Sequence, residues 1–236
     1  MRILPGIEIY GNALVLDNTT LIISDLHLGY EALQSSVMVP RKQWQTMKEK
    51  LSDIFSHFPI TTVIVNGDIK HHFGGVLDAE WRLVLRFLDF LLPRKIILVE
   101  GNHDQSLKTI AQKRGLVPHS YFIHKTCIIT HGDEIPPLAS SIQTIIIGHE
   151  HPMITLTRGN RRESYKCFLR TKYKGKNLII MPSFHELTKG SNVIEEKPLS
   201  PLLSSYSEAE VYAVDGTSVF DFGKVRNIAK NLCYKS

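Results

Sequence analysis

Side chains that can bind a metal follow short apolar runs at five places in this sequence. Each run is rich in Ile, Leu and Val, as in a buried strand. The polar segments that follow them are Asp25-Leu26-His27, Gly67-Asp68, Asn102-His103-Asp104, His131-Gly132-Asp133 and His149-Glu150-His151. In open α/β sheets, sites are built just past the carboxyl ends of the strands. The pattern therefore predicts that these five segments meet in one polar site.

The spacing and the chemistry of these side chains favour a metal centre. If the chain stays extended past the strand, residues two apart point to the same side, so Asp25 and His27 would share a pocket, as would His149 and His151. Neighbouring glycines would let the backbone turn and leave space beside the site. The donors are carboxylate, imidazole and amide groups without thiolate, a set that suits manganese, iron, zinc or a similar ion without singling one out.

Each segment alone also has an ordinary structural explanation. A Gly-Asp pair is usually a turn. We interpret Asp104 as the N-cap of the helix that follows it, with a role in orienting His103 as the alternative. Asp133 either supports His131 or lies in an exposed turn. Two histidines on one side of the chain, as at 149 and 151, rarely serve packing. The occurrence of all five segments in this order favours chemistry over coincidence.

Length and composition indicate an ordinary globular protein of the cytoplasm. The chain has 236 residues, of which 43% are hydrophobic and 22% charged, as in soluble domains. Its three cysteines, Cys127, Cys167 and Cys233, are scattered, which argues against a disulfide framework. No apolar run is long enough to cross a membrane and the N-terminal residues do not form a signal peptide, so we expect no membrane association. A net charge of +5 fits an anionic partner only weakly.

Hydrophobic periodicity predicts an α/β fold in a single domain, residues 1–236. Helices are expected at 40–58, 78–92 and 105–114. Strands are expected at 3–10, 13–16, 20–24, 61–65, 95–99, 121–124, 127–130, 144–147, 153–157, 165–170, 177–181, 210–214 and 218–221. Strand–helix alternation followed by a strand-rich half predicts two packed mixed β-sheets, a β-sandwich flanked by helices.

The ordered set of polar segments resembles the calcineurin-like metallophosphoesterase family, whose fold is such a sandwich. Within that family the chain is most similar to the small SbcD-related and ligase-associated (ICC-like) phosphoesterases of archaea and bacteria. The stretches that carry this finer resemblance are 67–74, 166–169 and 182–184.

The resemblance implies two divalent metal ions, manganese first, with iron, zinc or nickel as alternatives. One ion would be held by Asp25, His27, Asp68 and His151, and the other by Asp68, Asn102, His131 and His149. A hydroxide between the ions would attack phosphorus, and the catalytic His103 would stabilise charge or protonate the leaving oxygen. Some relatives orient this histidine with an aspartate that the present chain lacks, which leaves the partner of His103 open.

The substrate is expected to be nucleic acid, either DNA or RNA. Between 158 and 176 eight Lys or Arg residues accompany one acid, Glu163, and could form a basic ridge, with Arg161, Arg162 and Lys172 as candidate contacts. The alternative is a solvated hairpin. His71 is a further candidate contact near the pocket mouth.

The resemblance also suggests DNA repair beside a helicase or ligase partner. A small-molecule or cyclic-nucleotide phosphodiesterase and a non-catalytic scaffold subunit remain as alternatives. The complete ligand set counts against the scaffold.

Overall fold

The N-terminal part of the chain builds one mixed sheet with strand order β1-β2-β3-β4-β5-β6. The computed structural model describes residues 1–29, 40–71, 78–104, 106–158, 161–186, 188 and 190–233. In these residues the strands of the first sheet are β1 (Arg2–Leu4), β2 (Ile7–Tyr10), β3 (Ala13–Leu16), β4 (Thr20–Ser24), β5 (Thr62–Asn66) and β6 (Lys95–Val99). The last three strands are parallel, and Ser24, Asn66 and Val99 are in register, so their carboxyl ends lie at one edge.

The second sheet comes from the rest of the chain, in the order β13-β10-β11-β12-β9-β8-β7, with β14 paired to β11 and β15 to β14. Its strands are β7 (Tyr121–His124), β8 (Cys127–Thr130), β9 (Thr144–Ile147), β10 (Pro152–Arg158), β11 (Arg161–Tyr173), β12 (Lys176–Ile180), β13 (Ser191–Asn192), β14 (Glu210–Asp215) and β15 (Ser218–Lys224). Strands β8, β9 and β12 are parallel neighbours, which again brings strand ends together.

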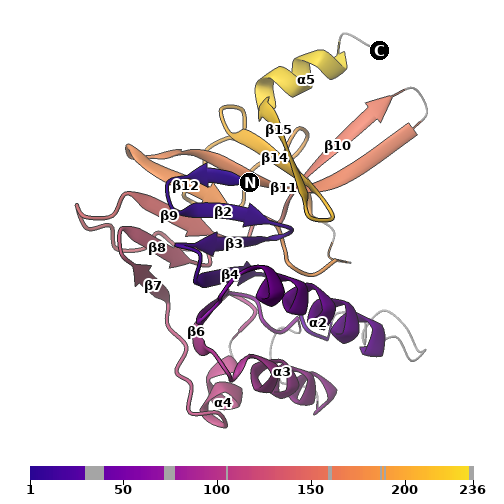
Figure 1. Ribbon diagram of the computed structural model, residues 1–236. Helices are drawn as coiled ribbons and strands as arrows, with labels where there is room; N and C mark the ends of the chain where they lie inside the picture. Colours follow the sequence, from indigo (N-terminus) through magenta and orange to yellow (C-terminus); the bar gives the residue numbers. More distant parts are fainter. Residues whose placement is uncertain are drawn as a thin grey trace.

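Alternation along the strands determines how the layers pack. Ile22 and Ile64 of the first sheet face Ile146 and Ile179 of the second, in one buried cluster between the sheets. The intervening residues of the first sheet pack against helices α2 (Pro40–His57), α3 (Asp78–Leu91) and α4 (Leu107–Gln112). Those of the second sheet pack against residues 202–209 and helix α5 (Val225–Cys233). Figure 1 shows the sheets between these two helical layers, which confirms the predicted β-sandwich flanked by helices.

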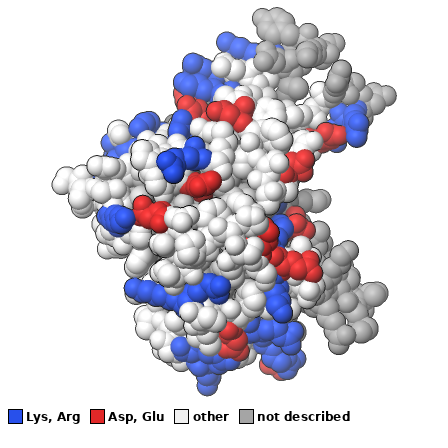
Figure 2. Space-filling model, viewed as in Figure 1, with Lys and Arg blue, Asp and Glu red and all other residues white. Residues whose placement is uncertain are grey.

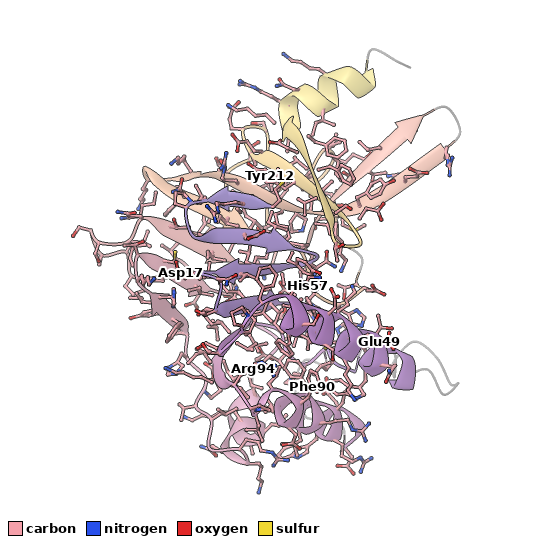
Figure 3. All side chains as sticks on the ribbon, in the orientation of Figure 1. Asp17, Glu49, His57, Phe90, Arg94 and Tyr212 are labelled. Carbon is pink, nitrogen blue, oxygen red and sulfur yellow. The ribbon has the colours of Figure 1, made fainter. Side chains whose placement is uncertain are left out.

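Aromatic side chains hold the helices on the outer face of the first sheet. Figure 3 shows Phe90 and Arg94 on the side of that sheet where α2 and α3 lie. The ring of Phe90 meets that of Trp44 edge to face at 5.7 Å, and the guanidinium of Arg94 lies 3.4 Å from the ring centre of Phe55. These contacts join α2, α3 and the start of β6.

Several elements differ from the sequence prediction. The first expected strand is two strands, because the chain reverses at Pro5-Gly6, where Gly6 has a φ of 73°. Strand β11 is longer at both ends than 165–170, since it forms a projecting hairpin with β10. The short strand β13 and the C-terminal helix α5 were not predicted. Among the residues of helix α5 whose burial the structure describes, Val225 and Ile228 are buried, a sparse apolar stripe in a short segment.

Candidate metal centre

Polar side chains from both sheets converge where the parallel strands end. Asp25 follows β4, Asp68 follows β5, and Asn102 follows β6. From the second sheet His131 follows β8, while His149 and His151 follow β9. Hydrogen bonds join the two edges directly: the side-chain amide of Asn66 donates to the carbonyl of Thr130 at 2.9 Å, and the amide of His149 donates to the Asp25 carboxylate. The seven predicted ligands therefore lie in one place.

The first donor group comprises Asp25, His27, Asp68 and His151, whose ligand atoms all lie within 4.8 Å of one another. Nε2 of His151 lies 3.2 Å from both Nε2 of His27 and Oδ1 of Asp25. Nε2 of His27 lies 3.9 Å from Oδ2 of Asp68. Two imidazole nitrogens and two carboxylate oxygens facing a common point fit a divalent cation.

The second donor group surrounds Nε2 of His131. This atom lies 2.9 Å from Oδ1 of Asn102, 3.1 Å from Nδ1 of His149 and 3.6 Å from Oδ2 of Asp68. The same Asp68 oxygen is thus within 4 Å of a histidine from each group. One carboxylate lies between two donor sets, which is the arrangement of a bridging ligand.

The charges in the cluster are those of a site that requires a cation. Burial, together with the nearby Asp25 carboxylate, raises the pKa of Asp68 to about 9. Burial lowers the pKa values of His27 and His131, so their imidazoles are neutral at pH 7 and free to bind a metal. The pKa of Asp25 lies below its ordinary value because His151 stabilises its carboxylate, although its burial acts in the other direction. A cation between these groups would relieve the repulsion between two ionised carboxylates and favour the ionised form of Asp68.

Left-handed backbone conformations orient these side chains. Five of the seven ligand candidates have positive φ, namely Asp25 (55°), His27 (41°), Asp68 (45°), His149 (64°) and His151 (44°). The expectation that an extended chain would align Asp25 with His27, and His149 with His151, is therefore wrong in its geometry. The side chains meet because the backbone turns at each ligand. Non-glycine residues rarely adopt this conformation, and such strain concentrates at functional sites.

Two glycines allow the ligands to approach the backbone closely. A Cβ on Gly101 would lie 2.3 Å from Oδ1 of Asp68. A Cβ on Gly148 would lie 2.0 Å from Oγ of Ser24 and 2.4 Å from Oδ2 of Asp25. No larger residue fits at either position without displacing a carboxylate of the centre.

His103 lies beside the two donor groups, and its ligand atom also lies within 4.8 Å of those of His27 and His71. Its backbone amide donates to Oδ1 of Asp68 at 3.0 Å, and its Nε2 lies 3.7 Å from Oδ2 of the same residue. Its Nδ1 lies 2.9 Å from the carbonyl oxygen of His71. That main-chain carbonyl takes the place of the missing aspartate, and it fixes the ring with Nε2 toward the centre. The ring of His71 stacks beside that of His103 at 6.0 Å between centres.

A family model for calcineurin-like phosphoesterases matches residues 19–213 of this sequence. The chain belongs to that family. Family membership makes it a phosphoesterase of a metal-dependent class, in agreement with the histidine and aspartate cluster described above.

One solved structure with the same fold is described as the crystal structure of Pseudomonas putida nuclease MPE. The two sequences are 18% identical, the TM-score is 0.63, and the alignment covers 89% of this chain and 92% of the other. At this identity the likeness shows the fold alone. No match was found among curated protein sequences.

Asp104 has a different role from the predicted helix cap. Its buried carboxylate accepts hydrogen bonds from the backbone amides of Ile69, Lys70 and Gly101, so it joins the loops that follow β5 and β6. Helix α4 begins two residues later than predicted, with Ser106 at its N-cap position and no side-chain cap bond. Burial raises the pKa of Asp104 to about 7. Asp133 is exposed, as in a turn.

Glu150 anchors the turn that carries His149 and His151, a role that the sequence analysis missed. Its carboxylate is 1% exposed and accepts from the amides of Leu199 at 3.0 Å and Ser200 at 2.5 Å, and from the hydroxyl of Tyr206. An acidic residue between two ligand histidines was the available signal, because alternating side chains would place it away from the metal. Glu150 therefore ties the centre to residues 199–206.

The structure divides the basic residues between 158 and 176 into separate groups. Arg161 and Arg162 are exposed near the tip of the β10–β11 hairpin, where they pair with Glu163 and Glu195. Lys172 lies at the far end of β11, about 30 Å away along an extended strand, and bonds to Asn177. Lys166 and Arg170 lie between these two groups along β11. They are partly buried, and they donate hydrogen bonds to Ser183, Glu210 and Ile3. On the face shown in Figure 2, Lys and Arg are dispersed among acidic residues. The described basic residues of this stretch therefore lie in separate groups.

Within the described residues, no helix has the length and apolarity that crossing a membrane requires.

Proposed function

We propose that this chain is a dinuclear-metal phosphodiesterase that cleaves phosphodiester bonds in nucleic acid. The observation that carries the proposal is the position of Asp68, whose carboxylate lies between two complete donor groups. One ion would be held by Asp25, His27, Asp68 and His151, and the other by Asp68, Asn102, His131 and His149. Manganese is the first expectation among ions that such nitrogen and oxygen donors accept, with iron, zinc and nickel as alternatives.

Bound here, two divalent cations would act as Lewis acids toward a phosphoryl group and would make water more acidic at neutral pH. The chain itself contributes two carboxylates, while its other ligands are neutral. A site loaded with two dications therefore keeps a net positive charge, which attracts the phosphate of a substrate.

His103 would handle the proton of the leaving group. If Nδ1–H is donated to the carbonyl of His71, a proton taken up on Nε2 would point toward the centre, although burial lowers the pKa of the ring. From there it can stabilise the charge that develops on the leaving oxygen, or protonate that oxygen. The bond from the His103 amide to Asp68 ties this group to the bridging carboxylate.

The position of the β10–β11 hairpin favours a polymeric substrate over a small molecule. Strand β10 begins directly after His151 and runs for seven residues, about 20 Å, away from the centre. Arg161 and Arg162 stand near the tip of this hairpin, which projects from the body in Figure 1. A nucleic-acid backbone that extends from the metal centre along this hairpin would meet one of the two guanidinium groups, because adjacent residues of a strand point to opposite faces. The Pseudomonas protein with the same fold carries the name nuclease, in agreement with this proposal.

A substrate panel tests the proposal. Metal-reconstituted protein is compared on phosphomonoesters, bis-aryl phosphodiesters, cyclic nucleotides, and single- and double-stranded DNA and RNA. We expect cleavage of bis-aryl diesters and of at least one nucleic acid, all abolished in Asp68→Asn and retained in Asp221→Asn, which alters an exposed aspartate of β15. Turnover confined to monoesters or cyclic nucleotides would refute the nucleic-acid assignment and favour a small-molecule phosphodiesterase.

A further inference from the structure

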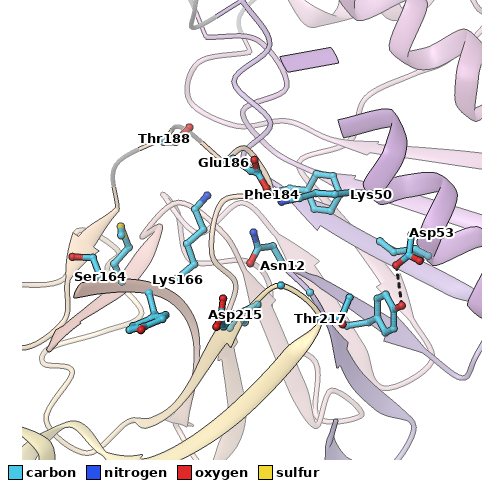
Figure 4. Close-up of a pocket in the computed structure, with 17 residues that line it drawn as sticks. Asn12, Lys50, Asp53, Ser164, Lys166, Phe184, Glu186, Thr188, Asp215 and Thr217 are labelled. Carbon is cyan, nitrogen blue, oxygen red and sulfur yellow. Dashed lines mark hydrogen bonds and ion pairs between the residues drawn. The ribbon is translucent and has the colours of Figure 1, made fainter. Parts of the chain in front are cut away.

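A cavity of about 490 Å³ lies beside the candidate metal centre. It is formed by the turn between β2 and β3, helix α2, the base of the β10–β11 hairpin, the turn between β14 and β15, and the residues Phe184, Glu186 and Thr188. Figure 4 shows Lys166, Asn12 and Phe184 around its middle, with Ser164 and Asp53 toward opposite ends. Its volume is in the range of pockets that bind small organic ligands.

Short connections link this cavity to the metal ligands. The amide of Phe184, a lining residue, donates to the carbonyl of Ser24 at 2.8 Å, and Ser24 precedes Asp25. The hydroxyl of the adjacent Ser183 donates to the carbonyl of Asp25 at 2.7 Å. Met153, another lining residue, follows His151 by two positions. A ligand in the cavity would therefore lie next to the first donor group.

The cavity contains a partly buried cation, Lys166, without a counter-charge in contact. Nζ of Lys166 donates to the main-chain carbonyls of Ser183, at 2.8 Å, and His185. No carboxylate in the described part of the chain forms a salt bridge with it. Burial and the neighbouring Lys50 lower the pKa of Lys166 to about 7. Lys50 is also at the cavity, paired with Glu186 at 2.6 Å. An anionic ligand beside Lys166 would stabilise its charged form.

The rest of the lining fits a flat, hydrogen-bonding group. Oδ1 of Asn12 is buried and has no hydrogen-bond partner among the described residues, so it can accept from a ligand N–H. Tyr10, Tyr165 and Phe184 also line the cavity. The two tyrosine hydroxyls are already bonded to Asp53 and Glu163, which leaves their rings to contact a ligand. An aromatic base stacks on such rings and presents N–H groups at its edge.

We propose that this cavity binds one nucleotide of the substrate strand, with its base at Asn12 and the aromatic rings and its phosphate at Lys166. The inference rests on the proposed function, since that nucleotide is taken to flank the phosphate being cleaved. It adds a base-binding pocket outside the metal centre.

Calorimetry on the full chain in excess chelator tests the binding step without the metals. The probes are adenosine and uridine 5′-monophosphates, the two nucleosides and inorganic phosphate. We expect at least one monophosphate to bind more tightly than its nucleoside or phosphate alone. Lys166→Met should weaken that binding by about 10-fold or more, because a hydrogen bond to a charged group is lost. Lys113→Met, which alters an exposed lysine on another element, should leave it unchanged.

A second variant guards against misfolding of Lys166→Met. Thr217 is exposed at the cavity mouth, so Thr217→Trp would fill the cavity without altering the core. In metal-loaded protein this variant should raise KM for a short oligonucleotide several-fold and leave hydrolysis of a bis-aryl diester, which has no base, unchanged. Monophosphates that bind no better than phosphate, or an oligonucleotide KM that Thr217→Trp does not alter, would overturn the inference. Absence of all diester hydrolysis with nucleotide binding intact would instead refute the proposed function.

Discussion

Nδ1 of His103 lies 2.9 Å from the carbonyl oxygen of His71, and this contact orients the ring at the metal centre. The acceptor is a main-chain atom, so no sequence motif of side chains predicts this contact. Asp104 holds this segment in place through the amides of Ile69 and Lys70. The loop after β5 thus contributes the bridging carboxylate and also the group that orients the predicted catalytic histidine.

His103→Ala should lower kcat on an unactivated diester by about 100-fold or more, the usual scale for acid–base or charge stabilisation. Its metal content should stay at the wild-type level, because the ligand is the adjacent Asn102. His71→Ala is the matched control, since it keeps the carbonyl and should cost much less activity. Wild-type turnover in His103→Ala would require another proton donor.

Gly101→Ala should weaken metal binding, because its Cβ would lie 2.3 Å from Oδ1 of Asp68 and displace the bridging carboxylate. We expect a loss of bound metal in elemental analysis after dialysis. Gly216→Ala is a useful control: nothing lies within 4 Å of its Cβ, although its φ of 60° disfavours alanine. That variant should lose some stability and keep its metals. Equal metal content in the two variants would contradict the proposed geometry.

Glu150→Ala should lower the free energy of unfolding by about 2–4 kcal/mol, because it leaves the amides of Leu199 and Ser200 and a buried tyrosine hydroxyl without their charged acceptor. The metal site that includes His149 should also weaken, since the turn loses its anchor. Glu134→Ala alters an exposed acid nearby and should have little effect. Chemical denaturation measures the first effect and metal titration the second. An unfolding midpoint equal to that of Glu134→Ala would show that Glu150 is not an anchor.

The two ends of β11 should differ in their effect on nucleic acid. Arg161→Ala with Arg162→Ala should weaken single-stranded binding and make its salt dependence less steep, because fewer counterions are released. Lys172→Ala with Lys174→Ala, at the opposite end of the strand, should do neither. Binding isotherms at several salt concentrations give both quantities. A larger effect from the lysine pair would place the polymer on the other end of the sheet.

The positions of the candidate ligands could be predicted because they depend on strong signals. Apolar runs such as Ile145–Ile147 become buried parallel strands, and parallel strands in register deliver their following residues to one edge. The sequence does not reveal backbone conformation at those residues, so the left-handed turns at Asp25 and His149 were not expected.

Roles that depend on contacts with main-chain atoms could not be predicted from the sequence either. Asp104 and Glu150 accept hydrogen bonds from amides far along the chain, and no pattern of side chains records such partners. The number of basic residues in 158–176 predicted a ridge. Two of them, Lys166 and Arg170, instead donate hydrogen bonds to main-chain carbonyls and are partly buried. A count of basic residues does not say which of their side chains are engaged within the protein.

We propose that one carboxylate, Asp68, joins two metal ions that are both needed for diester cleavage. The most direct measurement titrates manganese into chelator-stripped protein while recording bound metal and the cleavage rate of a labelled single-stranded oligonucleotide. Wild-type protein should bind two ions per chain, with no cleavage before metal is added and a plateau when both ions are bound. Asp68→Asn should bind fewer ions and cleave little at any manganese concentration. Two tightly bound ions and normal cleavage in Asp68→Asn would show that the Asp68 carboxylate does not join the two ions.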